Sequence, residues 1–185
     1  MNTQLDKEQI AQLLLTPDAL VTLSLEDAKT IVGYMLLTRY PEGTIVFQAN
    51  QRDKPSDYML LVLEGDVLIE TISSGDSSAV VNMLSSGHLI GEMGVIDGEP
   101  RSANCTAQTD IEVAMLSRGD LERLLLEHPQ LGARFLLAIA KRLADRIRQG
   151  NQKLLMLNQV NDALQQEMKA QASKRPHRFM ADLSA

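Results

Sequence analysis

The hydrophobic period of this chain changes twice along its length, and this change constrains the fold more than any other feature. Between Thr44 and Leu116 the sequence consists of short runs rich in Val, Ile and Leu, separated by glycine or by clusters of Asn, Asp and Ser. Such runs predict antiparallel β-strands. The expected strands are 44–47, 58–63, 66–72, 79–84 and 113–116, with hairpin turns at 64–66 and 73–76. Turns about 8–12 residues apart are typical of a sandwich or barrel.

Helical spacing precedes these strands. The apolar residues of 5–15 have a loose helical spacing that Pro17 ends. Ser24, with Asp27 three residues later, resembles a capping box and predicts the start of a second helix. Its apolar face continues to Leu36, and the residue before a proline disfavours helix, so we expect this helix to end near Tyr40.

Helical spacing returns from Asp120. A short helix is expected to stop at His128, because Pro129 suits the first position of the next helix. An apolar seam then runs along that helix, with eight of its ten positions apolar. We call these positions the C-terminal seam: Leu136, Ala140, Leu143, Ile147, Gly150, Leu154, Leu157, Asn161, Leu164 and Met168.

The C-terminal seam predicts a partner helix. Its first two turns could instead lie on the domain of the same chain, but a seam sustained over four heptads indicates a coiled coil. Asn161 at a seam position favours two strands in one register. We therefore expect a parallel homodimer.

Composition excludes several classes of protein. The net charge of −6 opposes general attraction to nucleic acid or to anionic membranes, and no run approaches the length of a membrane span. A single cysteine, Cys105, allows no internal disulfide and reads as a small buried apolar residue. Three histidines in unrelated contexts and the lack of a nucleophile–base pair predict no metal site, no cofactor and no enzyme. The default expectation is a cytoplasmic protein.

The stretch 87–107 carries the chemistry of an anion site. It places Glu92 nine positions before Arg101, with Gly91 and Gly94 around the acid. Arg101 can hold a phosphate with its planar fork, together with the backbone N–H groups of a one-turn helix starting near Gly91. Glu92 would repel a phosphate, so its expected partner is a ribose hydroxyl. Ser102 can add a donor, and the expected apolar walls include Val81, Met83, Met93 and Ala103. Taken alone, a Glu and an Arg at this spacing are more often a surface ion pair than a ligand site.

The arrangement Gly-Glu-Met-Gly, a short spacer and then Pro-Arg-Ser-Ala resembles the phosphate-binding cassette of the cyclic nucleotide-binding domain family. The resemblance is greatest to the catabolite activator branch and covers about residues 43–148. It implies an eight-stranded β-roll with N-terminal helices and a long helix that closes over the base. It also implies that Gly91 and Glu92 bind the ribose, that Arg101 and Ser102 bind the phosphate, and that Arg142 reaches toward the cassette acid.

Two departures from the family stand out. Where the catabolite activator has a Thr-Ser pair that contacts adenine, this chain has Arg146-Ile147. Arg146 could stack on a purine or donate to guanine, so both cAMP and cGMP are expected ligands. The second departure is that the 13 residues from Ser173 are too few for a helix-turn-helix, so we expect no DNA binding.

The sequence thus predicts a mainly β fold with helices: an antiparallel β-roll, or jelly roll, with a long C-terminal dimerisation helix. The expected parts are N-terminal helices (1–40), a cyclic nucleotide-binding roll (41–128), a coiled-coil helix (129–172) and a frayed tail (173–185). We expect a non-enzymatic cyclic nucleotide sensor that forms a homodimer and acts on a downstream protein. The alternative is a dimeric scaffold with a vestigial pocket.

Overall fold

The computed structural model describes residues 5–51, 57–72 and 78–173, and at positions 72, 78–81, 172 and 173 it describes the backbone alone. The chain forms two compact units, residues 1–142 and residues 143–185. The helices are α1 (Lys7–Leu14), α2 (Leu25–Val32), α3 (Glu92–Asp97), α4 (Arg118–Glu127) and α5 (Pro129–Ser173). The strands are β1 (Leu36–Tyr40), β2 (Ile45–Phe47), β3 (Tyr58–Glu64), β4 (Val67–Ile72), β5 (Ser78–Leu84), β6 (Leu89–Ile90), β7 (Asn104–Ala107) and β8 (Ile111–Ser117).

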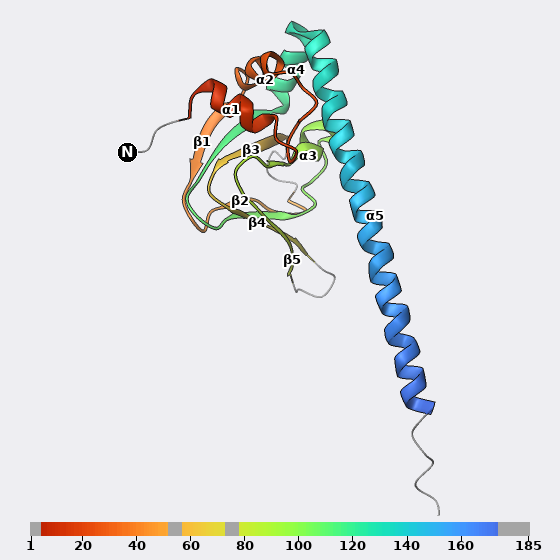
Figure 1. The fold of residues 1–185 in the computed structure, drawn as a ribbon. Coiled ribbons are helices and arrows are strands. Elements are labelled where there is room, and N and C mark those ends of the chain that lie inside the picture. The colour runs from red at the N-terminus through yellow and green to blue at the C-terminus, as the bar shows by residue number, and fades with distance from the viewer. Residues whose placement is uncertain (1–4, 52–56, 73–77, 174–185) are drawn as a thin grey trace, which may run out of the picture. The chain divides into compact units, whose positions relative to one another are not determined.

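The strands of the first unit form two four-stranded antiparallel sheets (Figure 1). One sheet has the order β1-β8-β3-β6 and the other the order β2-β7-β4-β5. Most neighbours within each sheet are far apart in sequence, as in β3 beside β8, whereas β4 and β5 are consecutive. This arrangement confirms the predicted β-roll, with its N-terminal helices and long C-terminal helix. In the described residues α5 is nevertheless so long, at 45 residues, that helix exceeds strand in total.

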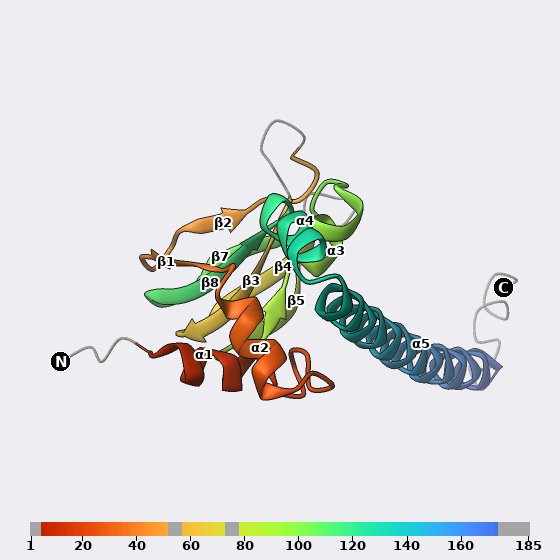
Figure 2. The same ribbon diagram turned by 90° about the horizontal axis from the view of Figure 1, so that it is seen from above.

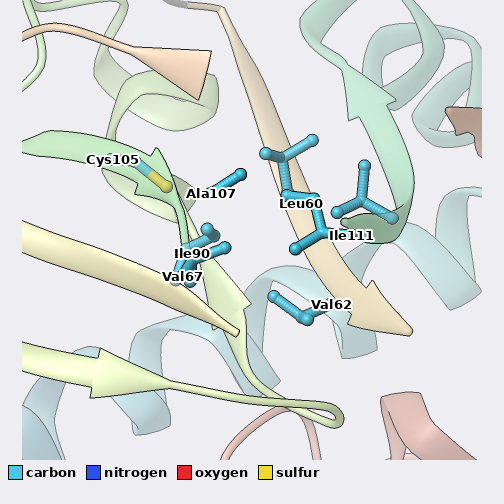
Figure 3. Packing of buried hydrophobic residues seen from close by; sticks show 8 residues of the cluster. Leu60, Val62, Val67, Ile90, Cys105, Ala107 and Ile111 are labelled. Carbon is cyan, nitrogen blue, oxygen red and sulfur yellow. The ribbon is translucent and has the colours of Figure 1, made fainter. Parts of the chain in front are cut away.

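The core lies between the two sheets. Leu60 and Val62 of β3 meet Val67 of β4 and Ala107 of β7 in one buried cluster (Figure 3). Cys105 belongs to the same cluster, as predicted for a small apolar residue, and burial raises the pKa of its thiol to about 12. Aliphatic side chains dominate the cluster because the chain is only 3% aromatic. Because aromatic residues are rare in this chain, the positions of those present need an explanation.

The N-terminal helices pack against one another (Figure 2). Ser24 caps α2 by accepting a hydrogen bond from the backbone N–H of Asp27, as the sequence predicts. The Asp27 carboxylate also accepts two hydrogen bonds from Arg134 of α5, which holds the pKa of Asp27 below its usual value. This pair joins α2 to the first turns of α5 within the first unit.

Two local predictions were wrong. Helix α2 ends at Val32 rather than near Tyr40, and residues 36–40 form β1. The reason is tertiary pairing, since every residue of β1 is opposite a residue of β8. The turn at 64–66 is also not a hairpin, because β3 and β4 belong to different sheets. Strands β4 and β5 do pair as a hairpin, but the turn predicted at 73–76 lies outside the described residues.

The C-terminal elements follow the predicted period. Helix α4 ends at Glu127, His128 caps it, and α5 begins at Pro129. In the second unit the described part of α5 is solvent-exposed along most of its length, including Ile147, Leu154 and Leu164 of the C-terminal seam. No helix within the described ranges is long and apolar enough to cross a membrane.

Candidate functional site

The predicted anion site is built on the turn between β6 and α3. Gly91 has φ +79° and begins α3, and Gly98 has φ +71° and ends it, so left-handed backbone brackets this single short helix. Residues other than glycine rarely adopt such φ values. A Cβ at Gly91 would also meet the Arg101 guanidinium and would lie 3.1 Å from the Tyr58 carbonyl oxygen. The sequence therefore needs glycine here for both conformation and space.

Arg101 is drawn into this turn. Its side chain is only 5% exposed, Nη1 donates to the Gly91 carbonyl oxygen at 3.0 Å, and Nη2 donates to the Tyr58 carbonyl oxygen at 2.5 Å. Its Nε is buried and has no hydrogen-bond partner in the described part of the chain. No carboxylate of the described residues forms an ion pair with it. Burial lowers the pKa of Arg101, while Tyr58 and Asp57 act in the opposite direction.

Two aromatic rings lie against the guanidinium. The Arg101 Cζ is 4.5 Å from the centroid of the Phe47 ring and 4.6 Å from that of Tyr58. Phe47 ends β2 and Tyr58 begins β3, so different sheets supply the two rings. Sequence reasoning missed both residues, because an aromatic side chain in a strand usually indicates core packing.

Glu92 lies at the first turn of α3 and is 1% exposed. Its Oε1 is 3.9 Å from Nε of Arg142, and Nη2 of Arg142 donates to the Leu89 carbonyl oxygen at 2.8 Å. The structure therefore brings the predicted cassette acid together with the helix arginine that the resemblance paired with it. A buried carboxylate generally needs such a cation to offset its lost hydration.

The remaining predicted site residues lie in varied surroundings. Met93 on α3 and Met83 on β5 are both exposed apolar side chains, Ser102 is exposed, and Ala103 is partly buried. Val81 is the extra residue of β5 where the register with β4 shifts, and its side chain lies outside what the structure describes. Arg146 lies on an exposed part of α5 in the second unit, so its contact with a base remains a prediction.

A concavity elsewhere on the roll is less suited to an anion. It has a volume of about 480 Å³ and is lined by Arg39, Tyr40, Pro41, Glu64, Asp110, Ile111 and Glu112. Its only arginine is already paired with Glu112, at 3.2 Å, and the other charged groups are carboxylates. We therefore place the candidate site at the cassette, where buried Arg101 has no ion-pair partner among the residues that the structure describes. The described residues contain no cluster of His, Cys, Asp and Glu side chains that could hold a metal ion.

Comparison with known proteins agrees with this geometry. The family model of the cyclic nucleotide-binding domain matches residues 37–128, which include both sheets and the cassette. The chain contains a cyclic nucleotide-binding domain. A crystal structure of a cyclic nucleotide-binding domain from Methylobacillus flagellatus aligns with 80% of this chain and 82% of its own, with TM-score 0.69 and 29% identity.

Curated relatives share the domain within longer chains. The Cyclic AMP receptor protein of Thermus thermophilus is 27% identical over 66% of this chain and 56% of its own length. A cyclic nucleotide-gated potassium channel of Mesorhizobium japonicum is 30% identical over 57% of this chain and 27% of its own. The chain spans about half the length of the first of these relatives and about a quarter of the second.

The crowding at Gly91 leads to a prediction about stability. In the cyclic nucleotide-binding domain, Gly43 also has a φ of +79°, but a Cβ there meets no atom within 4 Å. We expect G43A to lose about 1 kcal/mol of unfolding free energy from backbone strain alone, and G91A about 3 kcal/mol because crowding adds to strain. Denaturant titration of both variants measures the difference. Equal losses would show that Arg101 moves aside freely.

Proposed function

We propose that this protein is a cyclic nucleotide sensor whose cassette binds the cyclic phosphate through Arg101. The observation that carries the proposal is the buried guanidinium without an ion-pair partner among the described residues. A buried charge is costly unless it is paired, so this site favours an anion that brings its own negative charge. A phosphodiester supplies one charge and oxygens suited to the planar fork of arginine.

The ribose would lie on the Glu92 side of the turn. A carboxylate is acceptor-only when ionised, and a free ribose 2′-hydroxyl is the donor that a cyclic mononucleotide offers. The pairing of Glu92 with Arg142 supports this role, because it orients the carboxylate within the turn. Met83 and Met93, which are exposed, would supply apolar surface for the sugar and base, and Ser102 and Ala103 follow Arg101 directly in the chain. Val81 stays a predicted lining residue.

We further propose cAMP or cGMP as the ligand. Several relatives are named for cyclic AMP, as is the Cyclic AMP receptor protein of Thermus thermophilus. By resemblance, Arg146-Ile147 stand where the catabolite activator has the hydroxyl pair that contacts adenine, so the base preference would rest on a different contact here. Stacking by Arg146 would accept either purine, whereas donation to guanine O6 and N7 would favour cGMP.

The output would be a change in a helix dimer. Residues of the C-terminal seam such as Ile147 and Leu154 are solvent-exposed in the single chain. The helix of a second copy would bury these apolar side chains. Arg142 both approaches Glu92 and ends the first unit, immediately before the exposed part of α5. Ligand would thus favour one arrangement of the paired helices over another, and that arrangement would act on a downstream protein. The size of the effect would depend on how differently the ligand binds to the two arrangements.

The proposal is tested by calorimetry on the full-length protein with cAMP, cGMP, a cyclic dinucleotide and linear 5′-AMP. We expect one cyclic mononucleotide to bind at least about tenfold more tightly than 5′-AMP, whose second negative charge and open ring do not match a site with one cation. A 3′,5′-linked cyclic dinucleotide keeps its ribose 2′-hydroxyls but adds a second phosphodiester and a second base, so it should bind more weakly to a cassette that holds one phosphodiester through Arg101. Absence of binding at millimolar concentration would favour a dimeric scaffold with a vestigial pocket.

A further inference from the structure

The surroundings of Arg101 contain two aromatic rings that the proposed binding of phosphate does not by itself require. Only 3% of the chain is aromatic, yet two of the few rings pack against one guanidinium. An arginine on a protein surface can bind an anion without aromatic neighbours. Their position therefore calls for a physical explanation.

Hydrogen bonds to backbone carbonyl oxygens hold both rings beside Arg101. The carbonyl oxygen of Arg101 accepts a hydrogen bond from the N–H of Asn50, at 2.9 Å, which keeps the end of β2, and hence Phe47, next to this residue. The Tyr58 hydroxyl donates to the Val46 carbonyl oxygen at 3.0 Å, so its ring is fixed to β2 as well. The Tyr58 carbonyl oxygen then accepts from Arg101 Nη2.

Some N–H groups of Arg101 donate hydrogen bonds to carbonyl oxygens, and others do not. A guanidinium has five N–H donors in a planar fork, and one on each terminal nitrogen is taken by the Gly91 and Tyr58 carbonyl oxygens. The Nε–H is buried and has no hydrogen-bond partner in the described chain, and it lies in the same plane. Two carbonyl anchors and two ring faces together fix both the place and the orientation of that plane.

We propose that Phe47 and Tyr58 are positioning residues: their rings hold the plane of Arg101 so that a phosphodiester meets an oriented pair of donors rather than a mobile cation. This inference rests on the proposed function and adds to it the residues that set its affinity. Arginine loses side-chain entropy when it is fixed by a ligand, and fixing it beforehand removes that cost from binding. The guanidinium has also lost most of its water already, which strengthens its attraction to an anion.

The test measures cAMP and cGMP affinity for F47L, Y58L and Y58F in the full-length protein. We expect F47L and Y58L each to weaken binding about tenfold, because each variant removes one ring contact with a desolvated guanidinium. Y58F keeps the ring and the backbone carbonyl, so it should stay within about threefold of the wild type. Equal affinity of F47L, Y58L and the wild type would overturn the proposal.

A double-mutant cycle separates positioning from a general structural effect. In an R101K background the cation has no plane to orient, so F47L should then change affinity by less than about threefold. A tenfold loss in both backgrounds would show that Phe47 acts through packing, and would overturn the proposal.

A second readout does not depend on nucleotide. In the wild type the Arg101 Nε–H resonance, identified by its loss in R101K, should be sharp and shifted by ring currents, and F47L should move it toward the other arginines. A broad, rapidly exchanging signal in the wild type would overturn the inference. If the wild type bound no cyclic nucleotide, the proposed function alone would fail, and this signal would still decide whether the rings orient Arg101.

Discussion

Replacing Arg101 by alanine is expected to weaken binding of the preferred cyclic nucleotide by about 100-fold. The variant removes two or more charge-assisted hydrogen bonds to the phosphate, each worth about 1.5 kcal/mol or more, and each 1.4 kcal/mol is tenfold in affinity. Calorimetry on the purified full-length variant measures the effect directly. R101K should retain part of the affinity, because a lysine keeps the charge but loses the fork.

A matched control for R101A lies on the same roll. Arg39 lies on β1, and its side chain is 58% exposed and pairs with Glu112. R39A should leave nucleotide affinity within about twofold, since an exposed pair contributes little and lies outside the cassette. Equal affinity of R101A and the wild type would remove Arg101 from the phosphate role, and an equal loss in R39A would indicate a general effect of removing an arginine.

The largest expected effect concerns the C-terminal seam. The double variant L157D/L164D should convert a dimer into a monomer at micromolar concentration. Burial of one leucine side chain contributes about 1.5–3 kcal/mol, and a dimer buries four at these two positions, so the dissociation constant should rise by about four orders of magnitude or more. Sedimentation equilibrium of the full-length protein over a range of concentrations measures this change.

The control for the seam variant carries the same charge on another face of the helix. Gln152 and Gln159 are both exposed and lie off the C-terminal seam, five residues before Leu157 and Leu164 respectively. Q152D/Q159D adds the same two negative charges per chain and should stay dimeric. A monomeric wild type, or equal dissociation of both variants, would contradict the coiled-coil proposal.

The parts of the fold that depend on local pattern could be predicted from the sequence. The change from short apolar runs to helical spacing marked the roll and α5, and the one-turn helix expected to start near Gly91 is α3 in the structure. The capping role of Ser24 was equally readable, because a cap acts within three residues. Local signals failed at residues 36–40, where helical spacing gave way to pairing with β8.

Some residues of the candidate site could likewise be predicted from the sequence, and others could not. Its acid, its arginine and its glycines stand in one short stretch, and the resemblance to the cyclic nucleotide-binding family paired Glu92 with Arg142 before the structure brought them together. Phe47 and Tyr58 gave no such signal. An aromatic residue in a strand packs into the core in most proteins, and nothing in the sequence tells a ring facing aliphatic neighbours from a ring facing a guanidinium.

The sequence by itself determined which backbone segments could be strand, helix or tight turn, and which residue types could bind a phosphate and a ribose. Only the tertiary structure decided the state of Arg101: buried, hydrogen-bonded to a carbonyl 43 residues earlier, and held against rings from two sheets. The physical reason is range. Backbone preference is set by neighbouring residues, whereas the hydration, partners and orientation of a charged side chain depend on whichever distant elements the fold packs around it.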